Sequence, residues 1–201
     1  FNSLSQTLLK FASPGVADIY QGNEVWDFSL VDPDNRRPVD YKLRGHLLAE
    51  VDRRSSGDPA GFATELLKTR EDGRLKMYVT YRCLAARREL PSVFVGGSYI
   101  PLRLVGSRSS HLCAFARVGP GGETAIAVAP VLLARLLRGA AEPLGEEVWG
   151  TTRLLLPRRL GTRFRDAFTG QIFEAQSAVA GLRLPLRDVL GTFPVSLLLG
   201  K

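Results

Sequence analysis

A polar loop near the start of the 201-residue chain carries the side chains best suited to chemistry. Residues 14–40 read "PGVADIYQGNEVWDFSLVDPDNRRPVD", so acids, amides, aromatics and two adjacent arginines follow a short apolar run. Loops of this kind carry binding groups on a rigid scaffold. The alternative is a surface turn with ordinary solvated charges, and composition alone does not separate the two.

Seven side chains of this loop are candidate ligand contacts: Tyr20, Gln21, Glu24, Asp32, Asn35, Arg36 and Arg37. Glu24 could instead anchor the loop by accepting hydrogen bonds from backbone amides. The Asp-Pro-Asp-Asn sequence strongly favours a turn, which would give Asp32 and Asn35 structural roles. Since an arginine can fork onto a carboxylate, we expect Arg36 or Arg37 to contact a ligand or a catalytic acid and the other to brace the loop or face solvent.

Aromatic and apolar residues alternate just before that turn. Trp26, Phe28 and Leu30 follow one another at a spacing of two. A tryptophan in such a run either stacks on a ligand or belongs to a buried strap that fixes the loop. We expect the buried strap.

Other chemistries have little support in the sequence. Cys83 lies in a helical pattern and Cys113 in an apolar strand-like run, so both are expected to be small buried residues without a disulfide. His46 and His111 lie near no nucleophile motif and are expected to be structural, partly exposed residues. The spacing of these four residues matches no metal site, so we expect no metal and no cofactor.

Composition narrows the class of protein. The net charge is +7 and 45% of the residues are apolar, enough for a sizeable core. Arginines are scattered among acids rather than gathered beside stacking aromatics, so we expect no nucleic-acid binding. No long uncharged apolar stretch suits a membrane span or signal peptide. Two cysteines without an expected disulfide favour a reducing compartment, so we expect a cytoplasmic protein. The first residue is Phe1 rather than Met, which indicates a processed or excised piece.

The first half of the chain predicts helices around one strand. Residues 2–12 have a helical apolar face with a capping-box pattern at Ser3 and Gln6, and residues 16–20 predict a short buried strand before the polar loop. Further helices are expected between residues 40 and 90. The strongest, 75–90, has two apolar stripes and should be covered on two sides.

From Phe94 onward the apolar period changes to two. Short alternating runs separated by Gly-, Pro- and Ser-rich turns predict an antiparallel β-sandwich. Glycines at 96–97 and 119–122 are expected to form hairpin turns, residues 131–139 to include a short helix, and residues 195–199 to form a last strand. We therefore predict two domains, 1–93 and 94–201, of which the first is α/β and the second all-β.

Several segments resemble one enzyme family. "SLSQTLLKFASPGVADIYQGNEVWDFSLVDPDNRRPVD" resembles the late barrel region of the α-amylase superfamily (glycoside hydrolase family 13), and most closely that of maltooligosyl trehalose synthases. "DGRLKMYVTYRCLAARRELPSVF" resembles the last barrel helix of that family. "FRDAFTG" and "PVSLLLG" resemble its closing β-domain. The resemblance covers nearly the whole chain.

The resemblance implies the last strand and helices of a (β/α)8 barrel, followed by a C-terminal β-sandwich. It implies an isomerase of trehalose biosynthesis, which converts the reducing-end α-1,4 linkage of maltooligosaccharides to α,α-1,1 by intramolecular transglycosylation. No segment matches the catalytic carboxylate motifs of the superfamily, so this chain is expected to be a C-terminal portion, inactive alone, whose partners are the N-terminal barrel segment and a maltooligosaccharide.

One physical argument agrees with that expectation. A lone strand with amphipathic helices cannot pair its own edges or cover its own apolar faces, so residues 1–90 need neighbours. The alternatives are a non-catalytic carbohydrate-binding module or a fragment of another glucosidase of the α-amylase superfamily.

Overall fold

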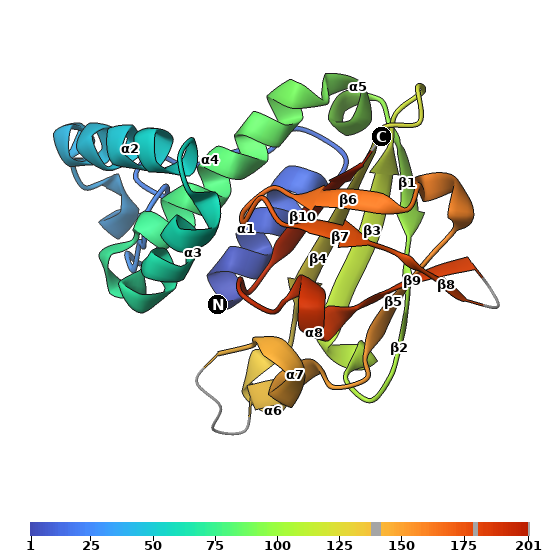
Figure 1. Ribbon diagram of the computed structural model, residues 1–201. Helices are drawn as coiled ribbons and strands as arrows, with labels where there is room; N and C mark the ends of the chain where they lie inside the picture. The colour runs from blue at the N-terminus through green and yellow to red at the C-terminus, as the bar shows by residue number, and fades with distance from the viewer. Residues whose placement is uncertain (138–141, 179–180, 201) are drawn as a thin grey trace.

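A computed structural model describes residues 1–137, 142–178 and 181–200. Helices from the first half of the chain lie against one side of a six-stranded sheet, and α2, α3 and part of α4 extend beyond it (Figure 1). A four-stranded sheet lies on the other side. The fold thus combines helices with antiparallel sheets, as the change of apolar period predicted.

The helical half contains seven helical segments: α1 (Asn2–Ala12), η1 (Asp34–Arg36), α2 (Tyr41–Ser55), α3 (Pro59–Lys68), η2 (Arg70–Asp72), α4 (Arg74–Glu89) and α5 (Pro91–Val95). The predicted helices are confirmed, but the capping box is wrong. Phe1 takes the N-cap position of α1, without a side-chain cap, since the helix already begins at Asn2. Asp40 and Asp58 cap α2 and α3 with their carboxylates.

The predicted strand at residues 16–20 is wrong for this chain. The segment belongs to no strand, and the Val16 side chain is 96% exposed. Strand pairing needs a second strand at about 4.8 Å, and no described residue supplies one here.

Helix α4 is covered on one side more fully than on the other. Tyr78, Val79 and Cys83 are buried, whereas Leu84 of the second stripe is 46% exposed. On α2 only Val51 among the spaced apolar side chains is buried. The predicted double coverage of α4 is therefore incomplete within this chain.

The strands form two antiparallel sheets. The six-stranded sheet has the order β1-β3-β4-β10-β6-β7 and the four-stranded sheet β2-β5-β9-β8. Their bounds are β1 (Ser98–Pro101), β2 (Arg103–Val105), β3 (Leu112–Val118), β4 (Thr124–Pro130), β5 (Arg153–Leu156), β6 (Arg163–Asp166), β7 (Ile172–Glu174), β8 (Gln176–Ala178), β9 (Gly181–Pro185) and β10 (Ser196–Gly200). The predicted last strand is thus confirmed as β10, which lies between β4 and β6.

Short helices and turns connect the strands: η3 (Ser109–His111), α6 (Leu133–Leu137), α7 (Gly145–Trp149), η4 (Arg158–Leu160) and α8 (Leu186–Val189). The helix expected within 131–139 is α6, and residues 138–139 lie outside the described residues. The glycine turn at 119–122 connects β3 to β4 as predicted. Glycines 96–97 instead join α5 to β1, because Pro91 starts a further short helix before the first strand, so the hairpin prediction is wrong there.

Alternate side chains of β4 and β10 belong to two different hydrophobic cores, one on each face of the six-stranded sheet. Ala125, Ala127 and Leu197 face the helices, whereas Ile126 and Leu198 face the second sheet. Successive side chains of a strand point to opposite faces, so both faces of this sheet are covered. Alanines toward α1 allow the helix to lie close to the sheet.

The two cysteines and two histidines differ in burial and lie in separate elements. Cys83 is buried and Cys113 half-buried, and neither is disulfide-bonded. His46 is exposed on α2, while His111 is half-buried and belongs to η3. No helix within the described ranges is long and apolar enough to cross a membrane.

Candidate functional site

The loop of residues 20–40 encloses a cavity of about 680 Å3. Its lining comes from the turn after residue 20, the segment around Trp26, the η1 turn and the start of α2. The lining side chains include three predicted candidates, namely Gln21, Asn35 and Arg37. Three carboxylates, two amides and two guanidinium groups thus line the cavity together with two aromatic residues, a set that can both donate and accept hydrogen bonds.

Arg44 of α2 holds the two ends of this loop together. Its Nε atom donates to Glu24 Oε2 at 3.2 Å, and its terminal nitrogens donate to the carbonyl oxygens of Gly22 at 2.9 Å and Asp40 at 3.2 Å. Glu24 therefore anchors the loop through a side-chain ion pair, not through backbone amides. Tyr41, next to the cap of α2, places its hydroxyl 3.4 Å from Gln21 Oε1.

Trp26 fixes the middle of the loop. Its indole Nε1 donates to the Arg70 carbonyl oxygen at 2.5 Å, and its half-buried ring packs against the helical core. The predicted strap is confirmed for Trp26 only. Phe28 is 90% exposed and Leu30 is also exposed, because no described element covers them.

The Asp-Pro-Asp-Asn-Arg-Arg segment folds on itself. Arg36 pairs with Asp32 at 2.5 Å and Arg37 pairs with Asp34. Asp34 also accepts from the Leu30 amide at 2.8 Å, as expected for a turn-forming aspartate. Both arginine side chains are mostly exposed, and such surface pairs contribute about 0–1 kcal/mol, so either guanidinium can exchange its aspartate for a ligand at little cost.

Two polar groups of the cavity are notable for their surroundings. Asn35 Oδ1 is buried without a hydrogen-bond partner among the described residues, so an acceptor is free inside the loop. Asp27 accepts from both the hydroxyl and the amide of Ser29, and these bonds lower the pKa of Asp27. That carboxylate is therefore ionised and committed to the local turn.

The structure separates the seven predicted residues into groups. Gln21, Asn35 and Arg37 line the cavity, while Asp32 and Arg36 pair on its outside edge. Glu24 lines a neighbouring groove between α2 and α4, and Tyr20 is exposed and lines neither cavity. Sequence reasoning missed Arg44, which touches three parts of the loop; its position four residues after the helix cap at Asp40 was the available signal.

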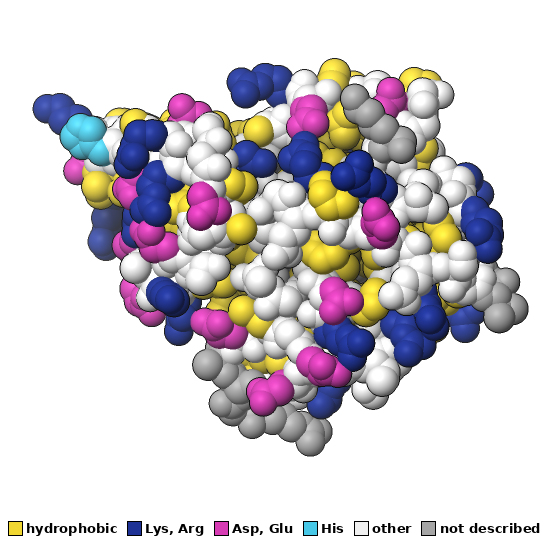
Figure 2. All heavy atoms as spheres, in the orientation of Figure 1, with side chains coloured by type: hydrophobic (Ala, Val, Ile, Leu, Met, Phe, Trp, Pro, Cys, Tyr) yellow, Lys and Arg dark blue, Asp and Glu magenta, His cyan; other side chains and the backbone are white. Residues whose placement is uncertain are grey.

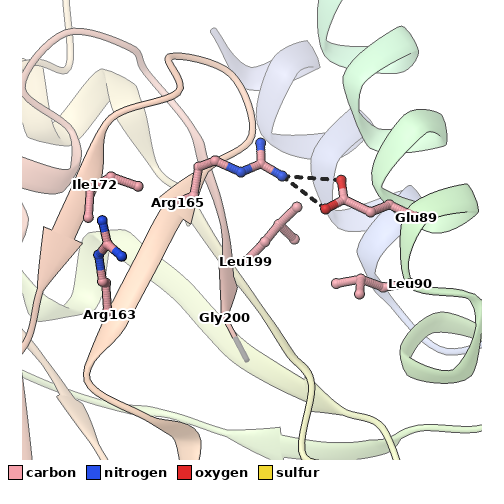
Figure 3. Close-up of a pocket in the computed structure, with 7 residues that line it drawn as sticks. All are labelled: Glu89, Leu90, Arg163, Arg165, Ile172, Leu199 and Gly200. Atoms are coloured by element: carbon pink, nitrogen blue, oxygen red, sulfur yellow. Dashed lines mark hydrogen bonds and ion pairs between the residues drawn. The ribbon is translucent and has the colours of Figure 1, made fainter.

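A second cavity of about 320 Å3 lies where the C-terminal end of α4 meets the edge of the six-stranded sheet (Figure 3). One terminal nitrogen of Arg165 bonds both Glu89 oxygens at 3.1 Å, and Arg163 lies on the same strand toward Ile172. This cavity contains a single carboxylate, which is already paired. A double displacement at a sugar carbon needs two, so this cavity does not provide that chemistry.

Basic and acidic side chains are mixed on the surface, as they are along the sequence. On the face seen in Figure 2, lysine and arginine side chains are interspersed with acids over both halves of the molecule. Within the part of the chain that the structure describes, no group of His, Cys, Asp and Glu residues could hold a metal ion.

No family model matches the chain. A curated relative, a putative maltooligosyl trehalose synthase from Mycobacterium tuberculosis, is 38% identical over 116 residues, which span 58% of this chain and 12% of that protein. Maltooligosyltrehalose synthase from Arthrobacter ramosus has a solved structure that matches 98% of this chain with a TM-score of 0.73 and 32% identity. A further solved maltooligosyl trehalose synthase matches 98% with a TM-score of 0.61 and 27% identity.

In each of these comparisons, the matched region is a small part of the relative's own length. The chain covers 22% of the Arthrobacter enzyme and 21% of the second solved synthase. The resemblance of the loop and strand segments is thus confirmed by both sequence and structure: the chain is a homologue of one part of the larger enzyme maltooligosyl trehalose synthase.

Proposed function

We propose that this chain forms one wall of the sugar-binding cleft, together with the closing β-region, of a maltooligosyl trehalose synthase. The enzyme isomerises the reducing-end α-1,4 linkage of a maltooligosaccharide to an α,α-1,1 linkage. The similarity of 98% of the chain to a solved synthase supports this function. In fold terms, residues 1–93 are the end of the (β/α)8 barrel and residues 94–201 a β-sandwich domain.

The reaction needs two carboxylates, and the described residues that line the loop cavity offer no uncommitted pair. One protonates the leaving glycosidic oxygen while the other attacks the anomeric carbon, about 5–5.5 Å away in retaining enzymes. Here the cavity aspartates serve local bonds: Asp27 to Ser29, Asp34 to Arg37 and Asp40 to the Leu43 amide. The catalytic carboxylates are therefore supplied by another part of the synthase, and the chain alone is inactive.

The loop would hold the released glucose during its reorientation. After the bond breaks, that glucose must stay in place and attack through its own anomeric hydroxyl, and water must be excluded meanwhile. Gln21 and Asn35 offer hydrogen bonds to sugar hydroxyls, and Tyr20 offers a ring face. One of Arg36 and Arg37 contacts the sugar or a catalytic acid, while the other keeps its aspartate.

A carbohydrate-binding module is the second candidate, and the burial of aromatics disfavours it. Such modules need exposed aromatic platforms, whereas Trp149 is 0% exposed and its indole donates to the Pro143 carbonyl oxygen at 2.9 Å. Among the described residues after Phe94, Tyr99 is the exposed aromatic side chain. Another glucosidase of the α-amylase superfamily is disfavoured by the adjacent arginines and by the named relatives.

The test uses maltopentaose and follows the loss of reducing ends, because an α,α-1,1 linkage has no free anomeric hydroxyl. We expect no loss with this chain alone and steady loss with the complete synthase that contains it. Isomerisation by this chain alone would contradict the placement of the carboxylates. Release of glucose without loss of reducing ends by the complete protein would indicate a hydrolase instead.

The arginines are tested in the complete synthase by Arg36→Ala and Arg37→Ala, with Arg53→Ala as a control on an exposed arginine of α2. A charged hydrogen bond is worth about 1.5–3 kcal/mol, so kcat/KM should fall roughly 10- to 100-fold for the variant that loses the contact. The control and the other variant should stay close to the unmodified enzyme. Equal activity in all three variants would contradict a role for either arginine.

A further inference from the structure

An apolar groove of about 730 Å3 runs between α2 and α4 on the side away from the sheets. Its lining is mostly apolar, with Ile19, Tyr41, Leu48, Met77, Tyr81 and Leu84 as the large side chains. Two structural pairs border it, Arg44 with Glu24 and the Tyr81 hydroxyl with Asp52 at 2.5 Å. Leu48 and Leu84 are each nearly half exposed, so apolar surface that would favour burial faces solvent.

The backbone beside this groove is also without strand partners. Residues 16–20 belong to no helix or strand, and within the described chain the carbonyl oxygens of Asp18 and Tyr20 accept only from the Lys10 side chain and the Asn23 amide. A segment with free amide and carbonyl groups can pair with another strand. Ile19 of this segment lines the groove itself.

A small polar cavity of about 120 Å3 adjoins the groove and shares Ile19 and Thr80 with it. Lys10 and Lys76 both line this cavity, and no carboxylate does. The buried Lys76 ammonium donates to Asn23 Oδ1 at 2.6 Å and to the Val25 carbonyl oxygen at 3.2 Å, both neutral acceptors. Burial, and secondarily the charge of Lys10, lower the pKa of Lys76. A negative charge placed here would relieve both effects.

We propose that another part of the same synthase polypeptide covers this face, packing apolar side chains into the α2–α4 groove and presenting a carboxylate to the cavity of Lys10 and Lys76. This inference rests on the proposed function. The chain corresponds to 22% of the length of a solved synthase, so the complete enzyme has further polypeptide that can pack against this face. The α2–α4 groove, the segment of residues 16–20 and the cavity that contains Lys10 and Lys76 adjoin one another through Ile19. One covering element could therefore contact all three.

The covering is tested by the reactivity of cysteines introduced at Leu48→Cys and Leu84→Cys. Both are made in a Cys113→Ser background, with Val95→Cys as the matched control on an exposed apolar residue beside the sheet. In this chain alone all three should react rapidly with a maleimide. In the complete synthase the two groove cysteines should react at least about tenfold more slowly, while the control stays within about twofold.

Equal reactivity of the groove cysteines in both proteins would overturn the proposal, and so would equal protection of the control. A second copy of this chain would be the occupant if reactivity in the chain alone falls as its concentration rises. Labelling does not depend on catalysis. Protected cysteines in a protein that forms no α,α-1,1 linkage would contradict the proposed function alone, and reactive cysteines in an active synthase would contradict this inference alone.

The proposed carboxylate beside Lys10 and Lys76 is tested by the variant Lys76→Met. Lys68→Met, on the exposed surface of α3, is the control. We expect Lys76→Met to lower the Tm of the complete synthase by several degrees more than that of this chain alone, because only the complete protein loses an ion pair. An equal decrease in Tm in both proteins would show that no carboxylate from the rest of the synthase pairs with Lys76. Lys76→Arg should recover part of the lost Tm only in the complete synthase.

Discussion

The two halves of the molecule differ in how completely they cover their own apolar surface. Every residue of β4 and β10 is buried, because helices cover one face of the six-stranded sheet and the second sheet covers the other. In the first half, several large apolar side chains remain exposed, among them Val16, Phe28, Leu30, Leu48 and Leu84. The six-stranded sheet is therefore covered within this chain on both faces, whereas the loop and the α2–α4 face leave apolar side chains exposed.

The largest effect should come from the core that joins helices to sheet. Phe168→Ala removes a fully buried ring that stacks on Phe193 at 5.2 Å, and should cost about 3–5 kcal/mol in the free energy of unfolding. Phe28→Ala, at an exposed position, should change it by less than about 0.5 kcal/mol. Urea unfolding of this chain measures both. Similar losses at the two positions would remove the contrast between the halves.

A buried carboxylate gives the next effect. Asp166 Oδ1 accepts from the amides of Phe168 and Thr169 and from the Thr169 hydroxyl, and Oδ2 accepts from the Ser196 hydroxyl at 2.5 Å. Asp166→Ala leaves these donors buried and unpaired, so we expect a loss of about 3 kcal/mol. Asp166→Asn keeps the shape and can donate to Ser196, so its loss in urea unfolding should be clearly smaller.

Asp166 also predicts a pH dependence. Burial raises the pKa of Asp166 above the ordinary value of 3.8, although four hydrogen bonds oppose the increase. The folded state then holds the proton more tightly than the unfolded state, so this residue's contribution is full below pH 3.8 and declines as pH rises toward the folded pKa. The stability of the unmodified chain relative to Asp166→Asn should fall over that window. A relative gain with rising pH would contradict the raised pKa.

A smaller effect is expected in the loop of the first half. Arg44→Met keeps the stem but removes the bonds to Glu24, Gly22 and Asp40, which should cost about 1–2 kcal/mol. Amide hydrogen exchange over residues 20–40 should accelerate, whereas exchange in β4 should not change. Arg53→Met on the same helix is the control. Unchanged exchange in the loop would show that the Trp26 bond alone holds it.

The smallest effect on stability should come from the paired arginines. Arg36→Ala and Arg37→Ala remove exposed ion pairs, and each should change the free energy of unfolding by less than about 0.5 kcal/mol. Circular dichroism during urea unfolding measures this. A loss above about 1.5 kcal/mol would indicate that the arginines hold the loop together, and would favour a structural role over ligand contact.

The helices and most of the β-region could be predicted from the sequence because their signals are local. Apolar period and helix-breaking residues indicated α1, α4 and β10 within one or two residues. The strand at 16–20 failed because pairing depends on a neighbour, which no periodicity reports. The capping box failed because Ser3 lies already inside the helix that begins at Asn2.

The candidate loop could be located from the sequence but not assembled. Residue types and the Asp-Pro-Asp-Asn turn marked the region, and Trp26 behaved as a strap. The bond between Arg44 and Glu24 joins residues twenty positions apart, so it depends on how the chain reverses direction. The exposure of Phe28 and Leu30 likewise depends on what lies opposite them in space.

Two hydrogen bonds tie α4 to the turn that follows β6, and a third ties β3 to the turn after α5. The buried Tyr78 hydroxyl donates to the Phe168 carbonyl oxygen, and Arg82 Nε donates to the Ala167 carbonyl oxygen at 2.6 Å. The buried Arg117 guanidinium donates to the Gly97 carbonyl oxygen at 2.8 Å and so ties β3 to the turn after α5. In the proposed sugar-binding cleft, we therefore expect movement within the loop of residues 20–40 rather than at the contact between α4 and the sheet.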